Sequence, residues 1–173
     1  MSKFDIKDLK NKDLFKSDTT NDLLKIAVIE RHNSSGNIGL GVIHGLKLEY
    51  GAIATTIAHD SHNLIVTGTN DEDIIFSIEK LKEINGGIII VKDNKVLASI
   101  PLEIGGLITA RDCDDVIDDL SDIYLSIKHV APKIDFNPFL TLSFLSLPVI
   151  PDLKLTDKGL FDVTKFNFID IAY

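Results

Sequence analysis

Two imidazoles, a carboxylate, a hydroxyl and an amide occur in five consecutive residues near the middle of the chain. These residues are His59, Asp60, Ser61, His62 and Asn63. The two histidines are three residues apart, which suits metal ligation on a helical turn or in a tight loop. The same residues could instead form a polar turn, because Asp, Ser and Asn side chains satisfy nearby backbone groups.

The segments on both sides of these residues, which must position them, are predicted to be β-strands. Residues 52–57 precede the polar group and residues 64–68 follow it, and both segments are rich in β-branched side chains. A second polar group, residues 30–32, follows another apolar segment at 23–29. If 23–29 and 52–57 are parallel neighbours, both polar groups lie at one edge of the sheet, where sites in open sheets are usual. If they are antiparallel neighbours, the two groups lie at opposite edges.

The composition indicates a globular domain. The chain has 173 residues, of which 45% are hydrophobic and 25% charged, enough for one domain with a core. A net charge of -8 argues against a nucleic-acid partner and against adhesion to an anionic membrane. No signal-peptide region or membrane-length apolar run is present. The single cysteine, Cys113, excludes an intrachain disulfide and a cysteine-based zinc site, and it fits a reducing cytoplasm.

Local signals predict further helices and strands. Asn70 followed by three acidic residues predicts a helix start, and the glycines in 85–87 predict its end. Apolar segments at 88–91 and 95–100 predict a β-hairpin. Apolar residues spaced three and four apart over 116–127 predict a second helix. This interleaving predicts an α/β or α+β fold, in which a mixed β-sheet is layered with helices.

Some segments allow two interpretations. Residues 1–22 are expected to be a loosely attached N-terminal segment, and residues 23–173 to form the domain. The glycines within 36–45 match no phosphate-binding loop, so we expect them to permit close backbone approach. The aspartates of 112–122 could bind a metal, but a solvated helix face is favoured. The apolar stretch 139–150 should be mostly buried in a core or contact a partner domain.

Several short motifs occur together and in a fixed order. They are Glu30-Arg31-His32, Gly36-Asn37-Ile38-Gly39-Leu40-Gly41, Gly51-Ala52-Ile53-Ala54, Ala58-His59-Asp60-Ser61-His62-Asn63, Gly68-Thr69-Asn70-Asp71-Glu72-Asp73, Pro138-Phe139, Thr141-Leu142-Ser143-Phe144-Leu145, Leu147-Pro148-Val149-Ile150-Pro151 and Leu155-Thr156-Asp157-Lys158-Gly159-Leu160. This ordered set, over about residues 23–163, resembles the C-terminal domain of bacterial and archaeal adenine deaminases of the amidohydrolase superfamily.

The resemblance implies a role in converting adenine and water to hypoxanthine and ammonia in purine salvage. It also implies a divalent metal, manganese or iron, that activates water in the full-length enzyme. In that superfamily the metal ligands lie on a (β/α)-barrel, beginning with a His-x-His pair. This chain contains no His-x-His and is far shorter than a barrel of about 250 residues. A further departure is Asn33-Ser34-Ser35, where relatives often carry His or Thr.

Three functions remain open from the sequence. The first is an adenine deaminase C-terminal domain, inactive alone, that completes or covers the active site of a barrel supplied in cis or in trans. The second is a stand-alone purine-binding or metal-binding regulatory module without catalysis. The third is an independent metal-dependent hydrolase that uses Glu30, His59, Asp60 and His62. A homo-oligomer is possible in each case.

The candidate residues for contacting substrate or supporting it belong to the two polar groups. They are Glu30, Arg31, His32, His59, Asp60, Ser61, His62 and Asn63. His59 and His62 are also the candidate metal ligands, and a distant His32 or His44 could complete such a site in space. Otherwise His32 and His44 are expected to be partly buried histidines with satisfied hydrogen bonds.

Overall fold

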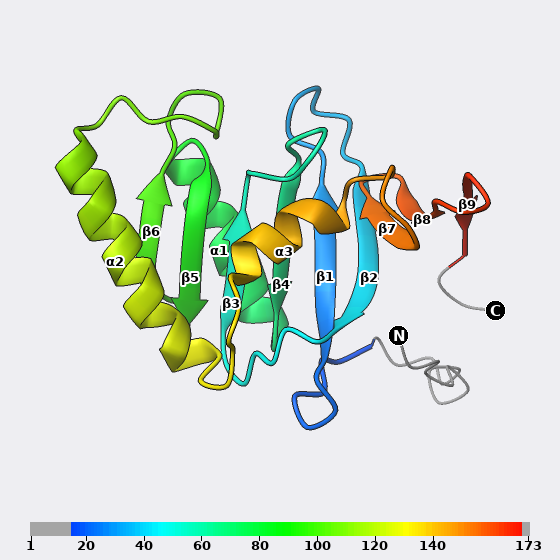
Figure 1. The fold of residues 1–173 in the computed structure, drawn as a ribbon, viewed down its shortest axis with the longest axis horizontal. Helices are drawn as coiled ribbons and strands as arrows, with labels where there is room; N and C mark the ends of the chain where they lie inside the picture. The colour runs from blue at the N-terminus through cyan, green and yellow to red at the C-terminus, as the bar shows by residue number, and fades with distance from the viewer. Residues whose placement is uncertain (1–14, 171–173) are drawn as a thin grey trace.

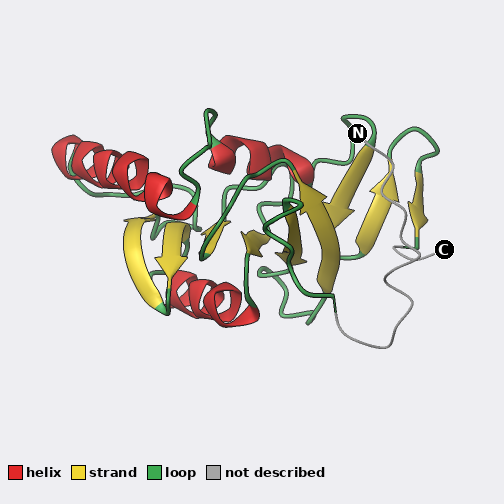
Figure 2. Ribbon diagram, turned by 90° about the horizontal axis from the view of Figure 1, so that it is seen from below, coloured by secondary structure: helices red, strands yellow, loops and turns green. Residues whose placement is uncertain are grey.

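The computed structural model describes residues 15–170, and a six-stranded sheet forms its centre (Figure 1). The strand order is β2-β1-β4-β3-β5-β6. Helix α1 covers one face of this sheet, and helices α2 and α3 cover the other, as Figure 2 shows. The elements are β1 (Leu23–Ile29), β2 (Ile38–His44), β3 (Ala52–Thr55), β4 (Leu64–Gly68), α1 (Asp71–Glu83), β5 (Gly87–Lys92), β6 (Lys95–Pro101), α2 (Cys113–Val130), α3 (Pro138–Leu145), β7 (Leu153–Thr156), β8 (Gly159–Asp162) and β9 (Asn167–Ile169).

The expected layered α+β fold is confirmed, and residues 15–170 form no closed barrel. Strand β1 contributes to two cores, one on each face of the sheet. Leu24, Ile26 and Val28 of β1 face the α2 and α3 side, while Ala27 faces α1. Fully buried Ala52 and Ala54 also face α1, and their small side chains let the helix lie close to the sheet.

The local predictions of helices and hairpins are confirmed. The Asn70 side chain caps α1 by accepting a hydrogen bond from the Asp73 backbone N–H at 2.7 Å. Asp73 is 2% exposed and also accepts from the Asn94 backbone N–H at 2.8 Å. This buried carboxylate therefore ties the start of α1 to the β5–β6 turn, a contact that the local pattern does not reveal.

The expected parallel neighbours do not pair with each other. Strand β4 lies between β1 and β3 and pairs antiparallel with both, with Ile29 opposite Leu64 and Thr55 opposite Ile65. The physical reason is local, because β3 and β4 form a hairpin across the short loop 56–63, which has a small closure cost. Both flanking strands nevertheless run in the same direction, so their carboxyl ends reach one edge of the sheet.

A second, three-stranded sheet of β7, β8 and β9 packs against β2. A Cβ atom at Gly39 would lie 1.8 Å from the backbone oxygen of Thr156, and a Cβ atom at Gly41 would contact Leu155. The glycines of β2 thus allow close backbone approach, as expected.

Other expectations have mixed outcomes. Residues 1–14 of the predicted loose segment lie outside the described part of the chain. Within 15–22, Ser17 Oγ donates to Gly68 O at 2.8 Å and accepts from the Lys25 backbone N–H at 2.9 Å, so this part is tied to the sheet. Stretch 139–150 was expected to be mostly buried or to contact a partner domain, and it is only partly buried: Leu142 is buried, whereas Leu140 and Val149 are 57% and 69% exposed. A contact of its exposed part with a partner stays a prediction.

Helix α2 has the acidic, solvent-exposed face that was expected at its N-terminal half. Arg111 forms an ion pair with Asp119 there. Cys113 is a free, exposed thiol at the start of the helix. No helix within residues 15–170 is both long enough and apolar enough to span a membrane.

Candidate functional site

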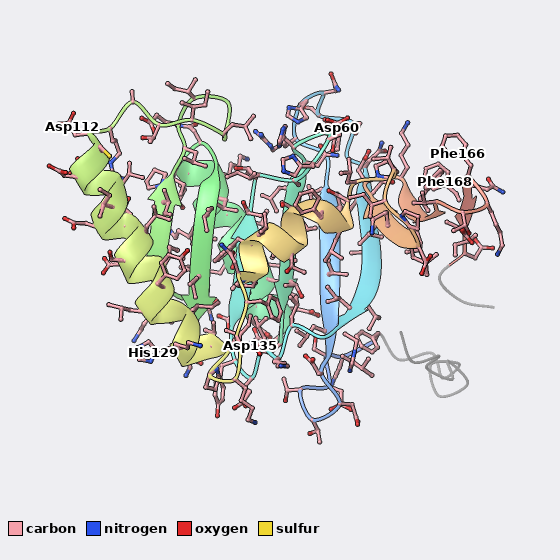
Figure 3. The ribbon with its side chains drawn as sticks, viewed as in Figure 1. Asp60, Asp112, His129, Asp135, Phe166 and Phe168 are labelled. Carbon is pink, nitrogen blue, oxygen red and sulfur yellow. The ribbon has the colours of Figure 1, made fainter. Side chains whose placement is uncertain are left out.

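The two polar groups of the sequence meet at the edge of the sheet where β1 and β3 end. Figure 3 shows Asp60 at this edge, while His129 and Asp135 lie at the opposite end of the molecule. Residues 30–32 follow β1, and residues 59–63 form the loop between β3 and β4. Loop 102–108, which follows β6, also reaches this edge through contacts with Arg31.

Arg31 joins the three loops of the edge. Its Nε donates to the His62 backbone oxygen at 2.6 Å, and its Nη2 donates to the Gly105 backbone oxygen at 2.8 Å. Gly106 permits this arrangement, because a Cβ atom there would lie 2.9 Å from Arg31 Nη1. Thr56 Oγ1 fixes the same loop by donating to the Gly106 oxygen at 2.6 Å. These contacts hold the guanidinium as a structural tie at the edge.

The neighbouring residues Glu30 and His32 have backbone partners. Glu30 accepts hydrogen bonds from the backbone N–H groups of His32, Asn33 and Ser35, and these bonds lower the pKa of its carboxyl group to about 2. A carboxylate so engaged is a loop cap, and it is poorly placed to act as a general base. The His32 Nε2 donates to the Ser61 backbone oxygen at 2.8 Å.

His59 is anchored to helix α3. Its backbone N–H donates to the Ser143 oxygen at 2.8 Å, and its backbone oxygen accepts from Ser146 Oγ at 3.0 Å. Its ring lies 5.0 Å from the Phe144 ring and 5.5 Å from the His62 ring, between centroids. The half-buried His59 imidazole therefore packs against the Phe144 ring, which is itself partly exposed.

His62 has an unusual ring nitrogen. Its Nδ1 atom is buried and has no hydrogen-bond partner among the described residues. Burial lowers the pKa of this imidazole, and the nearby His59 and Arg31 lower it further, so the neutral form is favoured at pH 7. A neutral imidazole with a free ring nitrogen can donate or accept one more hydrogen bond.

Asn63, the last residue of the loop, also has a buried polar atom without a hydrogen-bond partner among the described residues. It is 3% exposed, its Nδ2 donates to Asp157 Oδ1 at 3.2 Å, and its Oδ1 has no partner among residues 15–170. The second carboxylate oxygen of Asp157 accepts from Asn37 Nδ2 at 3.2 Å. Asp60 and Ser61, at the tip of the loop, are exposed.

Contacts from distant parts of the chain were missed by the sequence reasoning. Asp157 belongs to a segment interpreted only as a turn, and Phe144, Ser143 and Ser146 belong to a segment interpreted only as apolar. The polar residues within the apolar stretch were the sequence signal that could have indicated these contacts. His44 is not part of the edge, because it lies at the far end of β2, opposite Leu23, and it is exposed. His32 is also exposed, so the expectation of partial burial is wrong for both histidines.

The ligand set of the edge does not fit a divalent metal. Within residues 15–170 no three His, Cys, Asp or Glu side chains are grouped closely enough to hold one. His59 and His62 stand edge to face, and Glu30 is already engaged with the backbone. A metal bound by this chain alone would lack a third protein ligand.

The tip of the edge is exposed to solvent at Asp60 and Ser61. An apolar groove of about 460 Å³ lies between α2 and α3, where Tyr124, Phe136 and Phe139 line it. It does not include the polar residues of the edge. An open edge with an exposed carboxylate and a neutral imidazole is suited to contacting a surface or a ligand that another chain or domain holds.

Comparison with known proteins identifies the family of this chain. Residues 3–167 match the family model described as the adenine deaminase C-terminal domain. The chain belongs to this family. It is 55% identical over 149 residues to the adenine deaminase of Halalkalibacterium halodurans and 54% identical over 150 residues to that of Geobacillus kaustophilus. It is 51% identical over 158 residues to adenine deaminase 2 of Carboxydothermus hydrogenoformans.

The match covers most of this chain but a small part of each relative. It includes 86%, 87% and 91% of the chain, and 26%, 26% and 28% of the three relatives. The chain thus spans about a quarter of the length of the curated relatives it matches.

Proposed function

We propose that this chain serves as the C-terminal domain of an adenine deaminase, and that its polar sheet edge completes or covers the active site of a metal-dependent barrel. The observation that carries this function is the convergence of residues 30–32 and 59–63 at one open edge. His32, Asp60 and Ser61 are exposed at this edge, so a second surface that packs there would contact them directly. The family membership supports a catalytic domain as that surface.

The edge is assigned a positioning and covering role. The metal belongs to the barrel, since the ligand set of this edge does not fit one. Asp60 is exposed at the loop tip, where a carboxylate can accept hydrogen bonds from an amino group or from a barrel residue. His59 can pack its ring beside a purine or beside the barrel rim. The proposal includes a cytoplasmic location, because an exposed free thiol such as that of Cys113 persists in a reducing compartment.

A chimeric enzyme tests this function. In it, the present chain replaces the matching part of the Geobacillus kaustophilus adenine deaminase, and ammonia release from adenine is measured. We expect an active chimera in which Asp60→Asn or His59→Gln lowers kcat/KM by roughly tenfold or more, as misplacement of site groups does. The matched controls are Asp135→Asn and His129→Gln, which change exposed residues at the opposite end of the molecule (Figure 3).

If all four variants kept the activity of the unmodified chimera, the edge would have no part in the reaction. Equal losses in all four would also contradict the assignment, because the effect would not be specific to the edge. Melting temperatures of the variants separate a local effect from unfolding.

A second candidate function is a purine-binding module that acts without catalysis. The two unpartnered buried atoms, His62 Nδ1 and Asn63 Oδ1, favour it. Adenine carries an amino donor beside a ring acceptor; an amide oxygen can accept from the first, and the N–H of a neutral imidazole can donate to the second. Calorimetry with adenine and the isolated chain distinguishes the two functions. Tight adenine binding that Asn63→Leu removes would support the binding module. If adenine binding releases no heat, the chain needs a catalytic domain to act on adenine, which favours the first function.

A further inference from the structure

We propose that the outward face of helix α3, defined here by the exposed side chains of Leu140 and Phe144, docks on the catalytic domain of an adenine deaminase and positions the His59 loop against that domain. This inference rests on the proposed function, because it names the surface through which the chain meets its partner. It goes beyond that function by assigning the main contact to a helix outside the polar edge.

Helix α3 differs from the other two described helices in having no charged residue. α1 and α2 both carry acidic residues in the first turn and basic residues in the last turn. Residues 136–151, which include all of α3, contain no Lys, Arg, Asp or Glu, although 25% of the chain is charged. Apart from Thr141 and Ser143, every residue of the helix is apolar. A helix that is apolar on all sides is normally buried on all sides.

The described residues bury only one side of this helix. Phe139 and Leu142 pack in the core beneath it. Leu140 and Phe144 are four residues apart and so share the opposite face, and they are 57% and 38% exposed. Figure 2 shows α3 as an outer layer on its side of the sheet. The turn that follows the helix adds the exposed side chain of Val149. A partner that covered this face would remove the apolar side chains from water.

The same helix holds the His59 loop. The Ser143 oxygen accepts from the His59 backbone N–H at 2.8 Å, and Ser146 Oγ donates to the His59 oxygen at 3.0 Å. The Phe144 ring, on the exposed face, lies 5.0 Å from the His59 ring between centroids. The α3 face is therefore continuous with the polar edge, and one partner surface can cover both. A helix fixed by docking would fix His59 with it.

A catalytic domain is the occupant that these observations favour. The chain spans about a quarter of the length of the adenine deaminases it matches, so most of each relative lies outside the matched region. An uncharged face suits the centre of such a contact, because charged residues are depleted there. Each copy of the chain carries a net charge of -8, which opposes association of two copies.

Alkylation of a cysteine placed on the α3 face tests the contact. Leu140→Cys is made in a Cys113→Ser background, both in the isolated chain and in the Geobacillus kaustophilus chimera, and mass spectrometry gives its labelling rate. We expect labelling in the chimera to be slower by roughly tenfold or more, because a covered residue reacts only when the contact opens. The matched control is Ile75→Cys on α1, which is 54% exposed on the other side of the sheet. It should react at the same rate in both proteins.

A charge on the α3 face tests the link to the His59 loop. Leu140→Lys should leave the melting temperature of the isolated chain near that of wild type, because this side chain is exposed. In the chimera it should return amide exchange of residues 59–63 to the faster rate of the isolated chain, whereas Ile75→Lys should not. Slow exchange at 59–63 that Leu140→Lys leaves unchanged would overturn the proposal.

Equal labelling of Leu140→Cys in the chimera and in the isolated chain would also overturn it. Labelling of the isolated chain that slows with rising concentration would make a second copy the occupant. Labelling that speeds up on removal of residues 1–14 would make that segment the occupant. Either result contradicts a catalytic domain on this face.

The proposed function can fail separately from this contact. A protected α3 face in a chimera whose activity is insensitive to Asp60→Asn and His59→Gln would support the contact and contradict the role of the polar edge. An unprotected α3 face in a chimera that both substitutions impair would support the role of the edge and overturn the contact.

Discussion

At the scale of single residues, the polar edge separates residues that hold loops from residues that remain free to act. Glu30 and Arg31 are engaged with backbone groups of the edge loops. Asp60 is exposed, and His62 keeps a buried ring nitrogen without a partner among the described residues. Residue type alone would rank the carboxylate of Glu30 as a catalytic candidate, but its hydrogen bonds identify it as a cap.

The capping role of Glu30 predicts a pH-dependent effect on stability. Its pKa is about 2 in the folded chain against 4.5 ordinarily, so its stabilising effect is present above pH 4.5 and is lost as the pH falls toward 2. We expect Glu30→Gln to lower the melting temperature at pH 7. The difference from wild type should shrink as the pH is lowered from 4.5, which thermal unfolding at a series of pH values measures.

The control for this series is Glu79→Gln, which changes an exposed carboxylate on α1. It should show no comparable loss at pH 7. A Glu30→Gln protein as stable as wild type at pH 7 would mean that the hydrogen bonds to this carboxylate contribute nothing net.

At the scale of elements, the small sheet is held against the large one by the glycines of β2. A Cβ atom at Gly39 would lie 1.8 Å from the Thr156 oxygen, a backbone atom that cannot rotate away. At Gly41 the nearest atom would be a Leu155 methyl group at 3.3 Å, which can adjust. A methyl group should therefore destabilise the fold more at Gly39 than at Gly41.

We expect Gly39→Ala to lower the free energy of unfolding by about 1–3 kcal/mol, the usual range for overpacking. Gly41→Ala should cost less, because a side chain yields more easily than backbone. Urea unfolding of the two variants measures the difference. Equal and small effects at both positions would show that β7 and β8 do not pack on β2 as closely as described.

The elements that were predicted from the sequence are those with local signals. Asn70 caps α1 through a residue three positions away, and the β5–β6 hairpin closes over a two-residue turn. The insertion of β4 between β1 and β3 could not be predicted in this way, because it depends on contacts between distant segments. The same holds for the Asn63–Asp157 hydrogen bond, whose partners are 94 residues apart.

The candidate site was predictable in composition but not in detail. The His59–Asn63 group was visible as a polar cluster between two apolar strands, and the structure places it beside residues 30–32. The supporting contacts from α3 and from the turn at Asp157 come from long-range packing. No periodicity in the sequence encodes them.

At the scale of the whole molecule, the chain has a polar edge with exposed loop residues and no group of three metal ligands within residues 15–170. We therefore expect the purified chain to release no ammonia from adenine, even with manganese or iron added. An assay of ammonia with and without a chelator measures this. Chelator-sensitive release by the chain alone would contradict the assignment of the chemistry to a barrel.

Amide hydrogen exchange tests the central claim most directly, because it locates the surface that a catalytic domain covers. The comparison is between the isolated chain and the same residues within the Geobacillus kaustophilus chimera. The account predicts slower exchange in the chimera for residues 31–35 and 59–63, with little change over the exposed face of α1. Unchanged exchange at 59–63, together with slower exchange confined to α1 or β6, would contradict the account and place the catalytic domain elsewhere.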